Sequence, residues 1–178
     1  DNWGARVYTT QIYDPNLKYF YRGKTILDGV SSNFVGQINT THAGLTFDQM
    51  TSTNSQASVV RRCVVRDSEG VNALIKNSKR IHIEDTIFYM SKKTGVLIEG
   101  NIDTFNFTGN FLIGTKSRGL IDFGSDFTSS LDSYKATFTN SEVSNNIVLG
   151  CERHCITAPA GDCAAQQDGP WIFKNNVA

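Results

Sequence analysis

The stretch Phe107-Thr-Gly-Asn-Phe111 carries the pattern that decides the fold: an apolar residue, a polar one, a two-residue bend and a second apolar residue. The pattern recurs in Val60-Arg-Arg-Cys-Val64, Ile83-Glu-Asp-Thr-Ile87, Val143-Ser-Asn-Asn-Ile147 and Phe173-Lys-Asn-Asn-Val177. The five starts lie 23, 24, 36 and 30 residues apart. A repeat of this length with insertions is typical of stacked coils, in which each repeat buries its apolar side chains against the next.

A second apolar column supports the same register, because it follows each of the first four starts at one constant offset. Its members are Asn72-Ala-Leu-Ile75, Gly95-Val-Leu-Ile98, Gly119-Leu-Ile-Asp122 and Cys155-Ile-Thr-Ala158. The insertions must then follow this column, at Phe123 to Lys135 and Ala158 to Gly169. The sequence therefore predicts an all-β, right-handed parallel β-helix, a pectin-lyase-like solenoid with coils of about 24 residues and loop insertions.

We expect one continuous domain that is a fragment of a longer chain. Residues 59–178 form the regular coils, and residues 1–58 form the first coils and the junction with a preceding module. Within the latter, Gly23 to Val30 and Ala43 to Phe47 are predicted strands, whereas the aromatic run Tyr19-Phe-Tyr21 is left unplaced.

Strand alternation predicts which side chains face the interior and stack on the preceding coil. Phe105, Phe107 and Phe111 are expected to stack on Ile81, Ile83 and Ile87. At the bends, Gly and Asn tolerate left-handed backbone. We predict a structural ladder in which Asn110, Asn146 and Asn176 hydrogen-bond from coil to coil, with Thr86 and Cys63 in the equivalent places of earlier coils.

The composition excludes several classes of protein. Lys plus Arg and Asp plus Glu both number 17, so there is no net charge to attract nucleic acid. No apolar run approaches the length of a membrane span, and direct membrane insertion is not expected. No enzyme fingerprint motif or carboxylate cluster is present, so no cofactor and no metal site are predicted.

The cysteines and two sequons favour a secreted or lumenal compartment. Cys151, Cys155 and Cys163 lie close together in sequence, and the favoured disulfides are Cys155–Cys163 or Cys151–Cys163. Metal ligation with His154 is the less favoured alternative, and Cys63 is expected to be a buried free thiol. Asn39 and Asn106 begin N-glycosylation sequons; Asn39 lies in a polar loop and Asn106 points outward between two phenylalanines.

Outward charged side chains are the only candidates for chemistry, since glycan cleavage needs paired acids and bases. They are His82, Glu84, Asp85, Lys92, Lys93, Arg118, Asp122, Glu152, Arg153 and His154. Asp122, Glu152 and Arg153 are the catalytic candidates, and a solvated β-face explains the set equally well. Asp122 occupies the column of Ile75 and Ile98, where a structural ion pair with Arg118 or Lys116 is favoured.

The order of several motifs resembles the parallel β-helix region of the fibrocystin and fibrocystin-like family, which is related to the cell-surface hyaluronidases. These motifs are Asp1-Asn-Trp-Gly-Ala-Arg-Val7, Leu27-Asp-Gly-Val30, Phe34-Val-Gly-Gln37, Val59-Val-Arg-Arg-Cys63, Gly95-Val-Leu-Ile-Glu-Gly100, Ser144-Asn-Asn-Ile-Val-Leu-Gly-Cys-Glu-Arg-His-Cys-Ile156 and Gly161-Asp-Cys163. Glu152-Arg153 match the family, whereas Cys155 replaces a glycine, Ile156 replaces an aromatic residue and Cys151 is extra.

The resemblance implies a large extracellular or cell-surface glycoprotein, with the ciliary membrane as one location, and it transfers no catalytic residue. We therefore expect a non-enzymatic, rigid β-helical rod whose partners are neighbouring modules of the polypeptide or of a surface assembly. The alternative is a glycan-binding or glycan-cleaving domain, a polysaccharide hydrolase or lyase. The outward charged residues and the kinship with hyaluronidases motivate it.

Overall fold

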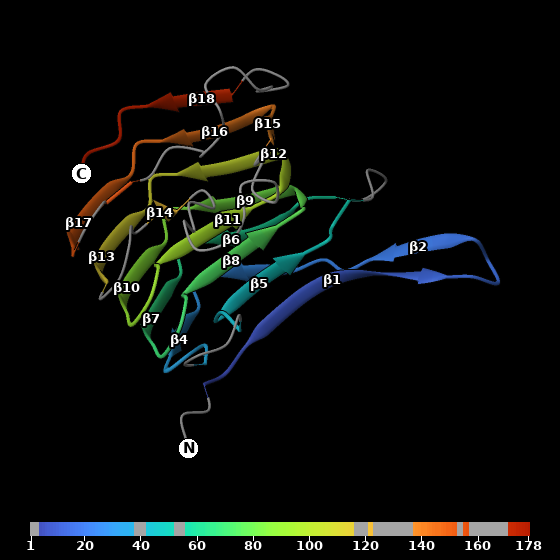
Figure 1. The fold of residues 1–178 in the computed structure, drawn as a ribbon, viewed down its shortest axis with the longest axis horizontal. Helices are drawn as coiled ribbons and strands as arrows, with labels where there is room; N and C mark the ends of the chain where they lie inside the picture. The colour runs from blue at the N-terminus through green and yellow to red at the C-terminus, as the bar shows by residue number, and fades with distance from the viewer. Residues whose placement is uncertain are drawn as a thin grey trace, which may run out of the picture.

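The computed structural model describes residues 4–37, 42–51, 56–115, 121–122, 137–152, 155–156 and 171–178. These residues form strands and connections, with no helix among them (Figure 1). The strands belong to three sheets whose pairings are parallel, apart from one antiparallel hairpin. The protein is therefore all-β, as the composition predicts.

The six-stranded sheet has the order β14-β11-β8-β5-β1-β2. Its strands are β1 (Val7–Asp14), β2 (Tyr19–Arg22), β5 (Leu45–Asp48), β8 (Ala73–Lys76), β11 (Val96–Glu99) and β14 (Ile121–Asp122). The five-stranded sheet, in the order β17-β13-β10-β7-β4, contains β4 (Ser31–Asn33), β7 (Val64–Ser68), β10 (Ile87–Ser91), β13 (Phe111–Thr115) and β17 (Ile147–Cys151).

The seven-stranded sheet has the order β18-β16-β12-β9-β6-β3, with β15 also paired to β12. Its strands are β3 (Ile26–Asp28), β6 (Ser58–Arg61), β9 (Lys79–Glu84), β12 (Asn101–Thr108), β15 (Thr137–Thr139), β16 (Ser141–Ser144) and β18 (Trp171–Lys174). The chain visits the three sheets in turn (Figure 1). One pass through the three sheets is here called a coil; β6, β7 and β8 make up one pass, and β9, β10 and β11 make up the next.

The register between coils agrees with the sequence repeat. The five starts, Val60, Ile83, Phe107, Val143 and Phe173, are paired in one continuous column. The first coil joins the same stack, because β3 pairs with β6, β4 with β7 and β5 with β8. The predicted strand segments at residues 23–30 and 43–47 therefore correspond to β3 and β5.

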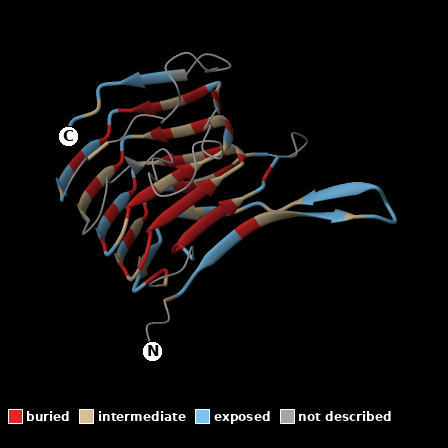
Figure 2. Ribbon diagram, viewed as in Figure 1, coloured by how far each residue is buried: buried red, intermediate tan, exposed pale blue. Residues whose placement is uncertain are grey.

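The core lies between the three sheets and is formed by inward side chains of successive coils (Figure 2). Its largest fully buried members include Phe47, Phe88, Phe105, Phe107 and Phe138. The Phe107 ring lies 6.0 Å from the rings of both Phe88 and Phe105. Burial of each such ring stabilises the fold by roughly 1.5–3 kcal/mol relative to exposure, so the stack of aromatic residues supplies much of the cohesion between coils.

One part of the stacking prediction is wrong. Phe105, Phe107 and Phe111 do pair with Ile81, Ile83 and Ile87, but Ile87 is 38 % exposed and Phe111 is only half-buried. The reason is the bend, where Gly109 takes a left-handed φ of 67° and shifts the alternation by one residue. The buried positions after it are Asn110 and Leu112, so Phe111 faces outward.

The predicted place of Asp122 is also wrong. The structure pairs Val96 with Ile121 and Leu97 with Asp122, so Asp122 is not in the column of Ile98. The physical reason is one additional residue in this coil: Val96 follows Ile83 by 13 positions, whereas Ile121 follows Phe107 by 14. The offset that appeared constant in the sequence changes at this coil. The insertions at residues 123–135 and 158–169 lie outside the described residues.

Candidate functional site

A column of left-handed residues marks the ends of the strands in the five-stranded sheet. It contains Phe34 (φ 52°), Asp67 (56°), Met90 (48°), Gly114 (69°) and Gly150 (71°), one from each of five successive coils. Because adjacent strands lie about 4.8 Å apart, the column runs about 19 Å along the stack. It bends every coil at the same place and forms a continuous surface feature.

A pocket of about 530 Å³ lies over this column. It is lined by Phe34, Asp67, Ser68, Glu69, Met90, Ser91, Lys92, Gly114, Gly150 and Glu152. Two glycines leave its floor open, and a Cβ at Gly114 would lie 2.6 Å from the Met90 Sδ. Phe34 and Met90 supply the apolar surface, with exposed fractions of 67 % and 41 %.

The charges of the pocket are mostly acidic. The Lys92 Nζ lies 2.5 Å from a Glu69 carboxylate oxygen, and Arg66 pairs with Asp67 at 3.1 Å. Glu152 is exposed and forms no ion pair with any residue that the structure describes. The serine hydroxyls are committed to the corner, since Ser68 donates to the Val71 carbonyl and Ser91 to the carbonyls of Gly70 and Thr94. The pocket can therefore offer carboxylate acceptors beside an apolar surface.

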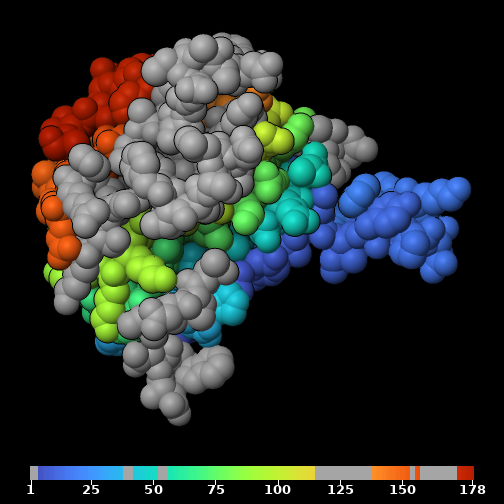
Figure 3. Space-filling model, viewed as in Figure 1, coloured from blue at the N-terminus to red at the C-terminus, as the bar shows by residue number. Residues whose placement is uncertain are grey.

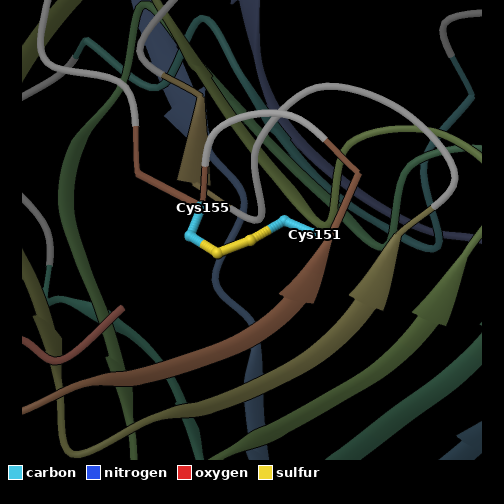
Figure 4. Close-up of a disulfide and its surroundings, with 2 residues drawn as sticks. All are labelled: Cys151 and Cys155. Atoms are coloured by element: carbon cyan, nitrogen blue, oxygen red, sulfur yellow. A yellow bond between two sulfur atoms is a disulfide. The ribbon is translucent and has the colours of Figure 1, made fainter.

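The disulfide differs from both pairings expected from the sequence. Cys151 and Cys155 are bonded to each other, with Cα atoms 5.3 Å apart (Figure 4). This separation lies within the usual range for a disulfide. It is short for residues four apart in a strand-forming chain because the chain turns back between them. Neither cysteine is therefore available to Cys163, which lies outside the described residues, and the loop that the bond closes contains Glu152. Cys63 is a buried free thiol, as expected.

Among the remaining candidates whose side chains the structure describes, none lines the pocket. His82 and Glu84 lie on the outer face of β9, with His82 Nδ1 4.0 Å from Glu84 Oε1, and Asp85 is a left-handed bend residue. Only the backbone of Asp122 is described, and it lies in β14 of the six-stranded sheet. Lys116, Arg118, Arg153 and His154 lie outside the described residues. Of the three catalytic candidates, only Glu152 is placed in the pocket.

Most of the pocket was not predictable from the sequence. Phe34, Asp67 and Met90 were not among the predicted site residues, because large or charged residues rarely adopt left-handed backbone and so give no sequence signal for it. Glu69 was not predicted either. Within the column, only Gly114 and Gly150 are residues whose type in the sequence suggests left-handed backbone.

The asparagines of the bend form hydrogen bonds from coil to coil. The Asn146 Oδ1 accepts from the backbone N–H and the Nδ2 of Asn110, at 2.9 and 3.1 Å. The Asn176 Oδ1 accepts from the same two groups of Asn146, at 3.1 and 2.8 Å. The row continues through Thr86 and Cys63. The backbone N–H of Thr86 donates to Asn110 Oδ1, and the backbone N–H of Cys63 donates to the Thr86 hydroxyl oxygen. These bonds satisfy bend groups that have no sheet partner.

Ion pairs on the outer surface also link successive coils. They are Asp28–Arg61, Lys76–Glu99, Lys79–Asp103, Lys92–Glu69 and Lys174–Glu142. The hydrogen bond from Arg62 lowers the pKa of the Asp28 carboxyl, and those from Ser144 and Lys174 lower the pKa of Glu142. Each exposed pair contributes little by itself because water and salt screen it, so their number rather than their individual strength matters.

The sequons differ in what the structure describes. Asn106 is half-buried on the outer face of β12, between buried Phe105 and Phe107, and its strand lies between β9 and β16. Asn39 lies outside the described residues. The outward orientation of Asn106 agrees with the alternation expected from the sequence.

Comparisons with known proteins gave no relatives. No family model matches the chain, and no curated protein or solved structure matches it. Within the described part of the chain, no three His, Cys, Asp or Glu side chains are grouped to hold a metal ion. The same residues contain no helix that could cross a membrane.

Proposed function

We propose that the chain is a right-handed parallel β-helix, a pectin-lyase-like solenoid, and that it serves as a rigid rod. The support comes from the order in which the chain visits the three sheets and from the unbroken column of the five repeat starts. In a solenoid of this kind, each coil contacts only the coils before and after it along one axis. The stack therefore holds the modules at its two ends at a fixed separation.

The rod belongs to a large fibrocystin-like protein at the cell surface, with the ciliary membrane as one location, and its partners are neighbouring modules. One observation supports the structural role: two sets of described polar groups link coil to coil. The Asn110–Asn146–Asn176 row and the five surface ion pairs all act in this way. The family resemblance of the motifs gives the surface location.

Peptide mapping of protein from its native source, with and without deglycosylation, tests this function. We expect glycan at Asn106 or Asn39 together with the Cys151–Cys155 disulfide. Bare asparagines and free thiols at these cysteines would place the chain in a reducing compartment, and the surface rod would have to be abandoned.

The pocket favours a second function, the binding or cleavage of a glycan. Its carboxylates can accept hydrogen bonds from sugar hydroxyls, while Phe34 offers an apolar face. Glu152→Gln should weaken binding in a glycan-array assay, whereas Glu142→Gln, on the outer face of β16, should not. A catalytic version is tested by changing Asp122, Glu152 and Arg153 together and measuring hyaluronan degradation. If degradation survives all three changes, these residues have no catalytic role.

A further inference from the structure

The hairpin of β1 and β2 extends beyond the body of the molecule (Figures 1 and 3). Val7 to Thr10 of β1 pair with β5, but Gln11 to Asp14 pair only with β2. Residues 11–22, here named the projecting hairpin, therefore form a two-stranded ribbon with no sheet beneath it. A ribbon of two strands is at best marginally stable in water on its own.

Most of the projecting hairpin is exposed (Figure 2), and its apolar side chains lie on both faces. Ile12, Tyr19 and Tyr21 lie on one face, and Tyr13 and Phe20 lie on the other, where their ring centroids are 4.7 Å apart. Leu17 occupies the turn, and all six side chains are between 47 % and 68 % exposed. A flat protein surface would cover one face and leave the other in water, whereas a lipid headgroup layer surrounds the ribbon.

The charges of this segment match an anionic surface. Between Pro15 and Leu27 the sequence contains Lys18, Arg22 and Lys24 but no acidic residue. The one carboxylate of the hairpin, Asp14, is engaged in the turn, where its Oδ1 accepts from the N–H groups of Asn16 and Leu17 at 2.8 and 3.2 Å. With Asp14 counted, residues 11–27 carry three cations against one carboxylate, a net charge of +2.

We propose that the projecting hairpin docks on an anionic lipid surface. Tyrosine has an apolar ring and a polar hydroxyl, which suits the boundary between headgroups and hydrocarbon. On their outer edges, Ile12 to Asp14 and Tyr19 to Tyr21 have no second strand as a partner among the described residues. Water can satisfy their backbone groups at headgroup depth, whereas hydrocarbon cannot. Docking is therefore peripheral, consistent with the expectation that the chain does not insert into the bilayer, and it gives a role to the aromatic run that the sequence left unplaced.

Flotation of the full chain with vesicles tests the proposal. Phosphatidylcholine vesicles containing phosphatidylserine should bind the protein, and pure phosphatidylcholine vesicles should bind it more weakly, by about fivefold for each cation engaged. Tyr19→Ser/Tyr21→Ser and Tyr13→Ser/Phe20→Ser should each weaken binding about tenfold, which corresponds to about 1.4 kcal/mol. The matched control is Tyr89→Ser/Leu149→Ser, which removes comparably exposed side chains from the body and should leave binding unchanged.

Circular dichroism and thermal melting show that each variant keeps its fold. Loss of vesicle binding in both hairpin variants, with the control unchanged, supports the proposal. Equal binding by all three variants overturns it. Sedimentation of the protein alone supplies an independent test. If the chain is a dimer that the hairpin variants dissociate, a second copy covers the hairpin and the lipid proposal is wrong.

Discussion

Removing one side-chain amide from the row of Asn110, Asn146 and Asn176 should destabilise the protein far more than the small size of an amide implies. Asn146 is fully buried, and its side chain takes part in four hydrogen bonds: two accepted from Asn110, one donated to the Phe107 carbonyl and one donated to Asn176. At about 1 kcal/mol each, their loss in Asn146→Ala should lower the free energy of unfolding by about 4 kcal/mol. The buried N–H of Asn110 is then left without its acceptor.

Urea denaturation followed by circular dichroism measures the global effect, and amide hydrogen exchange at Asn110 measures the local one. Exchange is needed because stacked coils can open separately and make the unfolding transition less than two-state. Asn106→Ala is the matched control, since Asn106 is half-buried on the outer face of β12 and its replacement should cost about 0.5 kcal/mol or less.

The loss in free energy of unfolding must be clearly larger for Asn146→Ala than for Asn106→Ala. If Asn146→Ala costs no more than Asn106→Ala, and the Asn110 amide remains protected from exchange, the buried row does not hold the coils together. The structural role proposed for the bend asparagines would then be refuted.

Four further predictions concern the core, a bend, the disulfide and an ion pair. Phe107→Ala should cost about 3–5 kcal/mol in urea denaturation, because its ring is fully buried between coils. Gly150→Ala should cost about 1 kcal/mol in thermal melting, since φ is 71° although the nearest atom to a new Cβ lies 3.6 Å away. Cys151→Ser should cost about 2 kcal/mol, as expected for a five-residue loop, and reductant should no longer affect urea denaturation. Asp28→Asn should remove stability that the wild type has above about pH 4 and loses as pH falls through the lowered folded-state pKa of Asp28; melting curves that differ equally at all pH values would contradict this.

The stacking register was predictable because it depends on a repeated physical requirement. Each coil must bury apolar residues against the last, so Ile83, Phe107 and Val143 recur at positions that the sequence shows directly. The inward or outward direction beyond a bend was not predictable in the same way. A single left-handed residue such as Gly109 reverses the alternation, and simple counting of residues carries the error to Phe111.

The site was less predictable than the fold, because its residues are not neighbours in sequence. The disulfide partner of Cys151 depends on how sharply the chain turns after β17, which spacing alone does not give. The place of Asp122 depends on one additional residue before β14. In both cases the outcome depends on the local path of the backbone. The connecting residues show no periodic pattern from which that path could be predicted.

The left-handed positions therefore have two different consequences in this molecule. At the bend between the seven-stranded and five-stranded sheets, they precede buried amides that join coil to coil, as Asn145 precedes Asn146. At the far end of the five-stranded sheet, Asp67 and Met90 precede serines that close the corner internally, and the column itself faces outward. The same backbone conformation thus strengthens one corner of the stack and opens a pocket at the next. Substitutions that fill Gly114 should then alter the pocket while leaving the asparagine row intact.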